Sequence, residues 1–128
     1  MESMTDFPLH AVLPVSDFDR AKTWYREKLG MRPSAEMGPN AWYRCAQGTV
    51  VIVMQTPNAG TARNTAAGFT VPDVESVMDE LRSREVTFED YDFGAMGRTE
   101  NGLMVIGNVK LAWFKDSEGN ILELRQTG

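Results

Sequence analysis

Two stretches of the chain share one pattern of hydrophobic and polar positions, a short apolar run followed by an amphipathic helix. The first run closes at Val15, and apolar residues then recur every three or four positions between Phe18 and Leu29. The second run closes at Val71 and is followed in the same way by the segment 74–81. This spacing places the apolar side chains on one face of a helix. Each stretch therefore predicts a strand that leads into a helix.

The residues that flank the first pattern predict where its helix begins and ends. Ser16 and Asp19 resemble a capping box, and in the second pattern Asp73 is of a type that caps helix N-termini. Gly30 follows the last apolar position of the first pattern, where glycine is favoured because it adopts a left-handed conformation freely. We therefore expect the first helix to span residues 17–29.

The chain also repeats itself, which indicates two related units. The triplet at residues 15–17 recurs 56 positions later, at 71–73. A longer stretch, 42–56, matches 113–127 with an offset of 71. In this alignment aromatic residues correspond to aromatic residues, Arg44 corresponds to Lys115, and the turn glycine Gly48 corresponds to Gly119. Two aligned stretches in the same order make chance similarity between hairpins the weaker explanation. Each half is therefore predicted to contain a strand, a helix and three further strands.

The predicted elements of the two units correspond one to one, and the main difference in length between the units lies in a single segment. They comprise residues 9–15, 17–29, 31–36, 41–46 and 49–55 in the first unit, and 67–71, 73–84, 86–90, 109–115 and 120–125 in the second. The difference between the two offsets places about fifteen extra residues in the segment 91–108. An insertion of this length is usually a flexible loop or a functional lid, and we expect one of these here.

Strand alternation predicts which faces of the sheets are buried. Val51 and Val53 share a face that matches the face of Leu122 and Leu124, and we expect it to pack on the helices. The opposite face is still largely apolar, so it must be covered as well. We therefore predict an α+β fold in a single domain, 1–128. Its two βαβββ modules, at about 7–57 and 65–127, are related by approximate twofold symmetry, and their curved mixed sheets enclose a cavity.

Composition and charge argue against two classes of binding partner, nucleic acids and membranes. With 13 Lys and Arg against 18 Asp and Glu, the net charge of −5 argues against a nucleic-acid surface. No apolar run approaches the roughly 20 residues that a membrane-spanning helix needs, and the start of the chain carries no secretory signal pattern. The single cysteine, Cys45, cannot form an internal disulfide, which fits the cytoplasm. A small molecule, rather than nucleic acid or a membrane, is the expected partner.

Three stretches resemble the vicinal oxygen chelate superfamily, which contains glyoxalase I, bleomycin-resistance proteins, fosfomycin-resistance transferases and extradiol dioxygenases. They are residues 10–17 (HAVLPVSD), 24–30 (WYREKLG) and 114–124 (FKDSEGNILEL). The resemblance covers nearly the whole chain and supports the two-module fold. It implies little about the activity, because this superfamily carries many functions on one scaffold. Because proteins of this resemblance are commonly dimers, it also implies a homodimer.

The resemblance further implies four equivalent metal-ligand positions, on the first and last strands of each unit. His10 matches the first of these and Glu123 the last, and both residue types suit Zn, Fe, Mn or Ni. The internal repeat places Ile52 and Ala66 at the other two positions, and neither side chain offers a lone pair. Catalytic metal sites generally have at least three protein ligands. We therefore expect no metal cofactor, with a divalent metal on His10 and Glu123 as the alternative.

Two functions follow from these expectations. The first is a binding protein that holds a small organic molecule, an antibiotic or a metabolite, between its modules without a metal. The second is a metal-dependent lyase, isomerase or dioxygenase that uses His10 and Glu123. These two residues are also the catalytic candidates without a metal, because a histidine beside a carboxylate titrates near neutrality. Whether any reaction is catalysed is left open.

Further residues are expected to line the ligand pocket because of their place in the two units. Aromatic rings stack on planar ligands, and methionine adapts its shape to a ligand, although both types more often belong to the core. The candidates for ligand binding are Trp42, Arg44, Ile52, Met54, Tyr91, Arg98 and Trp113.

Overall fold

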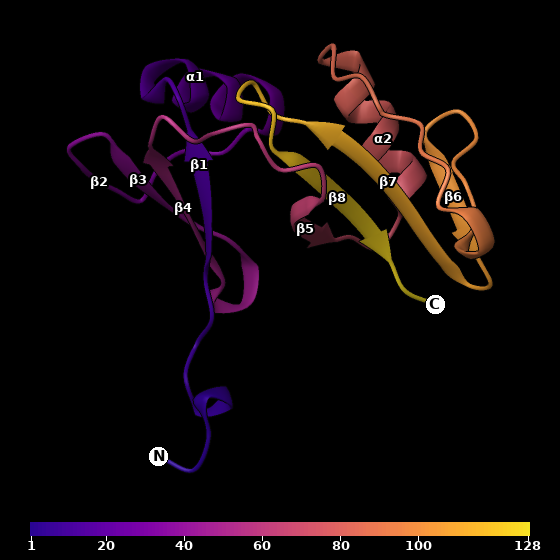
Figure 1. Cartoon of the computed structure of the whole chain (residues 1–128), viewed down its shortest axis with the longest axis horizontal. Coiled ribbons are helices and arrows are strands. Elements are labelled where there is room, and N and C mark those ends of the chain that lie inside the picture. The colour runs from indigo at the N-terminus through magenta and orange to yellow at the C-terminus, as the bar shows by residue number, and fades with distance from the viewer.

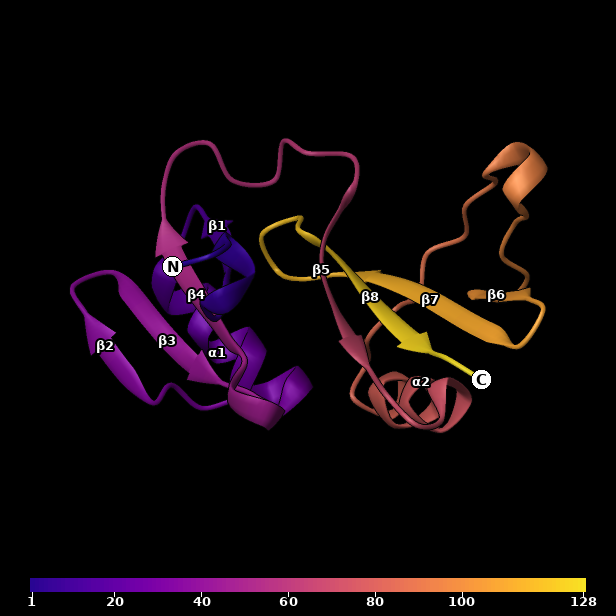
Figure 2. The ribbon, with the colours of Figure 1, turned by 90° about the horizontal axis from the view of Figure 1, so that it is seen from below.

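The computed structural model describes all residues, 1–128, as two modules that lie side by side (Figure 1, Figure 2). The first contains β1 (Ala11–Val15), α1 (Phe18–Leu29), β2 (Ala35–Met37), β3 (Asn40–Arg44) and β4 (Val50–Gln55). The second contains β5 (Thr65–Thr70), α2 (Val74–Ser83), β6 (Leu103–Ile106), β7 (Val109–Lys115) and β8 (Ile121–Gln126). Single 3-10 turns lie at Met4–Asp6, Ala46–Gly48 and Gly94–Met96. Neither α1 nor α2 is long and apolar enough to cross a membrane.

The two sheets have the same topology. The strand order is β1-β4-β3-β2 in the first and β5-β8-β7-β6 in the second. In each sheet the first strand runs parallel to the last, and the other neighbours are antiparallel. The predicted α+β fold with two similar βαβββ modules is therefore confirmed. The sheets remain separate and do not close on each other, so β1 and β5 are edge strands that face one another.

The repeat extends to the hydrogen bonds that begin the two helices. Asp17 accepts from the Arg20 backbone N–H at 3.0 Å, and Asp73 does the same for Ser76 at 3.1 Å. A glutamine from the last strand of each sheet adds a second cap to each helix, as Gln55 accepts from Phe18 N and Gln126 from Val74 N, both at 2.9 Å. Each helix therefore begins at an aspartate and a glutamine in matching positions.

The predicted capping box of Ser16 and Asp19 is wrong, because Asp17 is the N-cap residue. The Ser16 backbone N–H and hydroxyl both donate to Glu118 of the second module instead, at 3.0 Å. Gly30 ends α1 as expected, with φ at 67°. The role of Ser16 at the start of α1 therefore depends on a carboxylate 102 residues away in the sequence, and not on the neighbouring residues alone.

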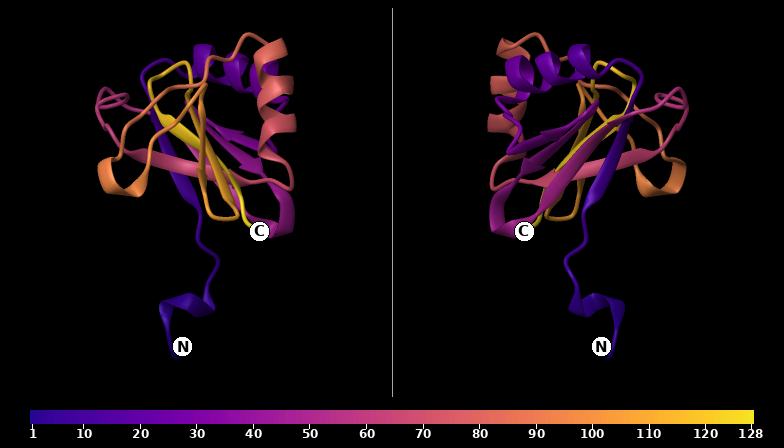
Figure 3. Two further views of the ribbon diagram at one scale, coloured as in Figure 1. Left: turned by 90° about the vertical axis from the view of Figure 1, so that its right-hand side faces the viewer. Right: turned by 90° about the vertical axis from the view of Figure 1, so that its left-hand side faces the viewer.

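The main core lies between each sheet and its helix. Val51, Val53, Leu122 and Leu124 are all buried and belong to one cluster of 18 residues, which confirms the predicted face of the strands. Helix residues such as Tyr25 in α1 pack into the same cluster. Figure 3 shows both helices toward one side of the molecule and the N-terminal arm extending away on the other. Apolar burial on this scale is the dominant stabilising contribution to the fold.

The predicted strand at residues 86–90 is wrong, and the strand in its place is β6, from within the insertion. Val86 and Phe88 are buried as an alternating strand would have them, but Phe88 pairs with Phe114 at one isolated bridge only. The carboxylate of Asp90 accepts hydrogen bonds from Thr99 and from the Gly102 backbone, which turn the chain out of the sheet. The chain returns to pair with β7 only at β6, Leu103–Ile106.

Candidate functional site

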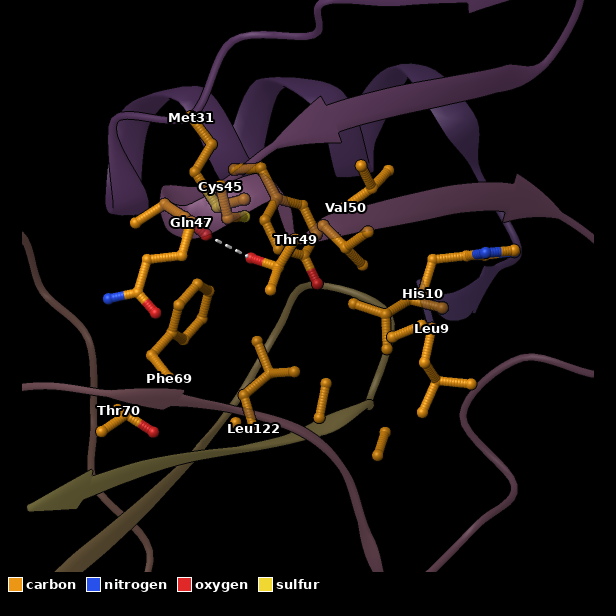
Figure 4. A pocket seen from close by; sticks show the side chains of 18 residues that line it. Leu9, His10, Met31, Cys45, Gln47, Thr49, Val50, Phe69, Thr70 and Leu122 are labelled. Atoms are coloured by element: carbon orange, nitrogen blue, oxygen red, sulfur yellow. Dashed lines mark hydrogen bonds between the residues drawn. The ribbon is translucent and has the colours of Figure 1, made fainter. Parts of the chain in front are cut away.

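A cavity with a volume of about 770 Å³ lies between the two modules (Figure 4). It follows the facing edges of β1 and β5, and thirteen of its eighteen lining residues are hydrophobic. Phe69 and Leu122 of the second module lie across it from Gln47, Thr49 and Val50 of the first. A mostly apolar hollow of this size with a few polar groups is typical of sites for small organic molecules.

The polar groups of the cavity come mainly from the turn between β3 and β4. Cys45 is free and half-buried there, and Gln47 and Thr49 follow it. The Thr49 hydroxyl donates to the Ala46 carbonyl at 2.9 Å, which holds the turn in shape. His10 lines the cavity at the start of β1 and is exposed. No aspartate, glutamate, lysine or arginine lines it, so its walls carry no permanent charge.

Glu123 lies on the open face of β8, away from the helices, and its two oxygens are both bonded by Arg125. Arg125 Nε donates to Oε2 and Nη2 donates to Oε1, each at 3.1 Å. The Glu123 side chain is only 13% exposed, and its hydrogen bond raises the pKa of Arg125. Gly68 lies opposite on β5, where a Cβ atom would sit 3.0 Å from Oε2 of Glu123. The missing side chain at Gly68 therefore makes room for this ion pair.

The residues at the four positions implied by the superfamily do not fit a metal. Ile52 and Ala66 have no donor atom, as expected from the sequence. Both oxygens of Glu123 accept from Arg125, while His10 lines the cavity and is not among the partners of Glu123. The chain brings together no group of three His, Cys, Asp or Glu residues that could hold a metal ion. We therefore derive no chemistry through a metal at this position.

The predicted ligand-binding residues of the first module lie on the open face of its sheet and, apart from their neighbour Val50, do not line the cavity between the modules. Trp42 and Arg44 line a second hollow of about 340 Å³ against β2. Ile52 is the register partner of Trp42, and Met54 is exposed farther along β4. These residues lie together, and their part in ligand binding stays a prediction.

In the second module, Tyr91 and Trp113 come together in an aromatic cluster with Phe93. The ring centroids of Tyr91 and Phe93 lie 6.0 and 5.1 Å from that of Trp113, which is buried. Arg98 lies apart, exposed on the insertion, where it pairs with Glu100 at 3.8 Å. The insertion therefore covers the open face of the second sheet with its own aromatic rings, and the ligand-binding role of these residues is untested.

A buried carboxylate that the sequence did not single out connects the two modules. Glu118, in the turn between β7 and β8, has a fully buried side chain and accepts six hydrogen bonds. The donors are Ser16, Asp17 and Arg20 of the first module and the neighbouring Ser117. The Arg20 guanidinium, 2.8 Å away, is the main cause that lowers the pKa of Glu118 from 4.5 to about 2. The only signal in the sequence was that Glu118 matches an uncharged residue, Gln47, in the other unit.

The same turn makes two further contacts with the first module. The Tyr25 hydroxyl donates to Asp116 at 2.6 Å, and Asn120 Nδ2 donates to the Pro14 carbonyl at 2.8 Å. Burial, and then the Asp116 charge, raises the pKa of Tyr25 well above its usual value. We call residues 116–120 the clasp, because they hold the modules in the relative position that forms the cavity.

Comparison with known proteins agrees with this architecture. The family model for the Glyoxalase/Bleomycin resistance protein/Dioxygenase superfamily matches residues 8–124. The chain therefore belongs to this superfamily, as the three sequence stretches indicated. A sequence comparison with curated proteins gives no match.

Several solved structures share the fold at low sequence identity. A glyoxalase/bleomycin resistance protein from Catenulispora acidiphila is 23% identical, with a TM-score of 0.68, over 95% of this chain and 99% of that one. A glyoxalase/bleomycin resistance protein/dioxygenase from Alicyclobacillus acidocaldarius is 15% identical, with a TM-score of 0.67, over 99% and 95%. The fosfomycin resistance protein FosX from Listeria monocytogenes, in complex with Mn(II) and sulfate, is 16% identical, with a TM-score of 0.70, over 98% and 93%. At these identities the likeness shows the fold alone.

Proposed function

We propose that this protein binds a small organic molecule in the cavity between its modules, without a metal. The observation that carries the proposal is the cavity of about 770 Å³ along β1 and β5, with apolar walls and few polar groups. The donor set supports a metal-free site, because Ile52 and Ala66 stand at two of the four ligand positions and Arg125 already neutralises Glu123. An antibiotic or a metabolite with a substantial apolar part is the expected ligand.

Binding of the neutral fluorescent probe N-phenyl-1-naphthylamine tests this proposal. We expect saturable binding of one probe per chain, because the apolar walls take up the naphthyl and phenyl rings. Ala66 lines the cavity and is exposed on β5, so the Ala66→Phe variant fills part of the space and weakens probe binding at least tenfold. Ala62→Phe makes the same change in the exposed linker between the modules, outside the lining, and serves as the control. Equal binding to both variants would contradict the proposal.

A metal-dependent lyase, isomerase or dioxygenase is the second candidate. It is favoured by the FosX structure, which holds Mn(II), and by the presence of two ligand-type residues, His10 and Glu123. Elemental analysis of untagged protein separates the candidates. The metal-free function expects no stoichiometric metal, whereas the second expects about one ion per chain, lost in His10→Ala and Glu123→Gln. A stoichiometric ion that depends on both residues would overturn the metal-free proposal.

We also propose that the protein is a cytoplasmic homodimer. The open face of the first sheet exposes Val12 and Met54, which are 46% and 43% exposed, and a second copy is a partner that would cover them. The free Cys45 fits a reducing compartment. Light scattering during size-exclusion chromatography is expected to give twice the chain mass of 14.3 kDa. A monomer at micromolar concentration would contradict the dimer.

A further inference from the structure

We propose that the hollow of about 340 Å³ on the open face of the first sheet is a second binding site, which takes a small aromatic carboxylate. The ring of this ligand packs on Trp42, and its carboxylate pairs with Arg44. The site is separate from the cavity between the modules, because the two share only Val50 in their linings. The second module indicates the ligand, since there the chain itself covers the equivalent position with aromatic rings and a carboxylate.

The two modules present the same pair of side chains on matching strands. Trp42 and Arg44 of β3 correspond to Trp113 and Lys115 of β7 at the offset of 71. In each pair the residues are two positions apart on a strand, so both side chains point to the same face of their sheet. Each module therefore offers a large aromatic ring beside a cation.

In the second module this pair is covered by one segment of the insertion, residues 89–93. The rings of Phe93 and Tyr91 pack against Trp113, with centroids 5.1 and 6.0 Å from that of the indole. The carboxylate of Glu89 pairs with Lys115 at 3.3 Å. Trp113 is only 5% exposed as a result. The segment 89–93 therefore shows which groups satisfy this position, namely aromatic rings for the indole and a carboxylate for the cation.

One residue explains why the first module lacks the carboxylate. The Ser34 backbone N–H donates to the Trp42 carbonyl at 2.7 Å, and the Glu89 backbone N–H donates to the Trp113 carbonyl at 2.8 Å. Ser34 therefore occupies the position that Glu89 occupies in the second module. Its hydroxyl donates to the same Trp42 carbonyl at 3.0 Å and has no charge to offer Arg44. Beyond Ser34 the chain continues as β2, so no segment returns over the open face.

The groups that are covered in the second module stay uncovered in the first. Trp42 is half-buried, and Arg44 is exposed and makes no ion pair or side-chain hydrogen bond within the chain. Glu36, the one carboxylate in the lining of the hollow, pairs instead with Lys22 of α1 at 3.0 Å. A guanidinium binds a carboxylate through two parallel N–H···O bonds, and aromatic rings pack on an indole. An aromatic carboxylate therefore supplies both groups that the segment 89–93 supplies to the second module.

The size of the hollow favours a small acid over a peptide or a protein surface. Pockets for small molecules have volumes of about 300 to 1,000 Å³, and this hollow is at the lower end of that range. Val12 and Met54, which the proposed dimer would cover, do not line the hollow. The dimer and the ligand therefore use different parts of the open face.

Two probes with the same ring system, 1-naphthylacetate and the neutral 1-naphthylacetamide, test the site by isothermal titration calorimetry. We expect Arg44→Gln to raise the Kd of the acid at least fivefold and that of the amide less than twofold, because only the acid uses the guanidinium. Trp42→Leu should raise both at least fivefold. Lys115→Gln is the matched control, because it removes the equivalent cation, which Glu89 already pairs. We expect it to change neither Kd.

A second variant tests the site without removing an aromatic side chain that folding could require. Ser34→Glu gives the first module the carboxylate of the second, and we expect this group to compete for Arg44 and to raise the Kd of the acid at least fivefold. Ser34→Gln adds the same bulk without the charge. The acid should bind to it at least threefold more tightly than to Ser34→Glu.

Three results would overturn the inference. The first is that neither probe binds, or that Arg44→Gln affects both equally. The second is that Ala66→Phe, which fills the cavity between the modules, weakens the acid as much as Trp42→Leu does, since the acid would then bind in that cavity. The third is that Trp42→Leu dissociates a dimer that does not bind the probes, since a second copy would then cover the hollow. The binding of N-phenyl-1-naphthylamine in the cavity is independent of all three results, so the proposed function is tested separately.

Discussion

Two turns that match in the internal repeat have opposite roles in this molecule. The turn between β7 and β8, the clasp 116–120, is buried against the first module, whereas the turn between β3 and β4, residues 45–49, is mostly exposed and lines the cavity. The strands on either side of the two turns match in topology and register. The two turns differ in single residues: Glu118 of the clasp corresponds to Gln47 of the other turn, and Asp116 corresponds to Cys45.

This comparison teaches that the repeat determines the backbone and that departures from it determine where the modules meet. A buried carboxylate needs several donors, and Glu118 finds them at the N-terminus of α1. Gln47 has no such requirement, and its side chain lines the cavity near Phe69 (Figure 4). The cavity therefore opens where the second clasp is missing. Four predictions test or refine this contrast.

The largest effect is expected when the clasp loses its charge. Glu118→Gln keeps the shape of the side chain but replaces one acceptor oxygen with an NH₂ group that faces N–H donors. Hydrogen bonds to a buried charge are worth more than neutral ones, and removing one partner leaves the others unpaired, so we expect a loss of about 3 kcal/mol in the free energy of unfolding. Urea denaturation measures it. Glu27→Gln makes the same change on the exposed side of α1 and should cost less than about 0.5 kcal/mol.

Acid should remove the same stabilisation without a mutation. The pKa of Glu118 is about 2 in the folded protein against an ordinary value of 4.5, so the unfolded chain takes up a proton first as the pH falls. The stabilisation is present above pH 4.5 and is lost as the pH falls toward 2. We expect the stability difference between the native protein and Glu118→Gln to shrink by about 2 kcal/mol between pH 6 and pH 3. A difference that stays constant with pH would show that the Glu118 charge is not the source.

A smaller effect is expected from the second contact of the clasp. Tyr25→Phe removes the hydroxyl that donates to Asp116 at 2.6 Å, and we expect a loss of about 1 to 2 kcal/mol. Asp116 keeps its bonds from Glu118 N and Asn120, which limits the cost. Tyr43 is the matched control, because its buried hydroxyl has no hydrogen-bond partner. Tyr43→Phe should leave the stability unchanged or raise it, and equal losses in both variants would contradict a specific role for the Tyr25 bond.

The sequence predicted the features that depend on local pattern and repetition. The alternation of Val51 and Val53 indicated the buried face, and Gly30 the end of α1, because both follow from the geometry of a single element. The position of β6 was missed because the side-chain bonds of Asp90, made to residues 9 and 12 positions away, decide where the chain leaves the sheet. The predicted cap at Ser16 was wrong for a similar reason, because Ser16 donates to Glu118 of the other module and Asp17 caps the helix instead.

The candidate site was less predictable than the fold. The repeat alone assigned Ile52 and Ala66 to two of the four ligand positions that the resemblance implies, since that inference requires only offsets along the chain. It did not indicate that Arg125 would bind Glu123, because residues two apart on a strand give no sign of which side chains fold back on each other. The sequence predicted a cavity between the modules, but it did not indicate that the cavity would follow the facing edges of β1 and β5, because this depends on how the clasp positions one module against the other.

The smallest effect on stability, and the most direct test of the contrast, comes from giving the first turn the charge of the second. Gln47→Glu places a carboxylate at the position that matches Glu118, but the turn is exposed and makes none of the contacts that Glu118 makes with Ser16, Asp17 and Arg20. The free energy of unfolding should therefore change by less than about 0.5 kcal/mol. Because Gln47 lines the cavity, the same charge should raise the Kd of the anionic probe 8-anilino-1-naphthalenesulfonate a few-fold at low salt and leave that of the neutral N-phenyl-1-naphthylamine unchanged. A large gain in stability would mean that the two turns are interchangeable and that the missing charge alone leaves the cavity open.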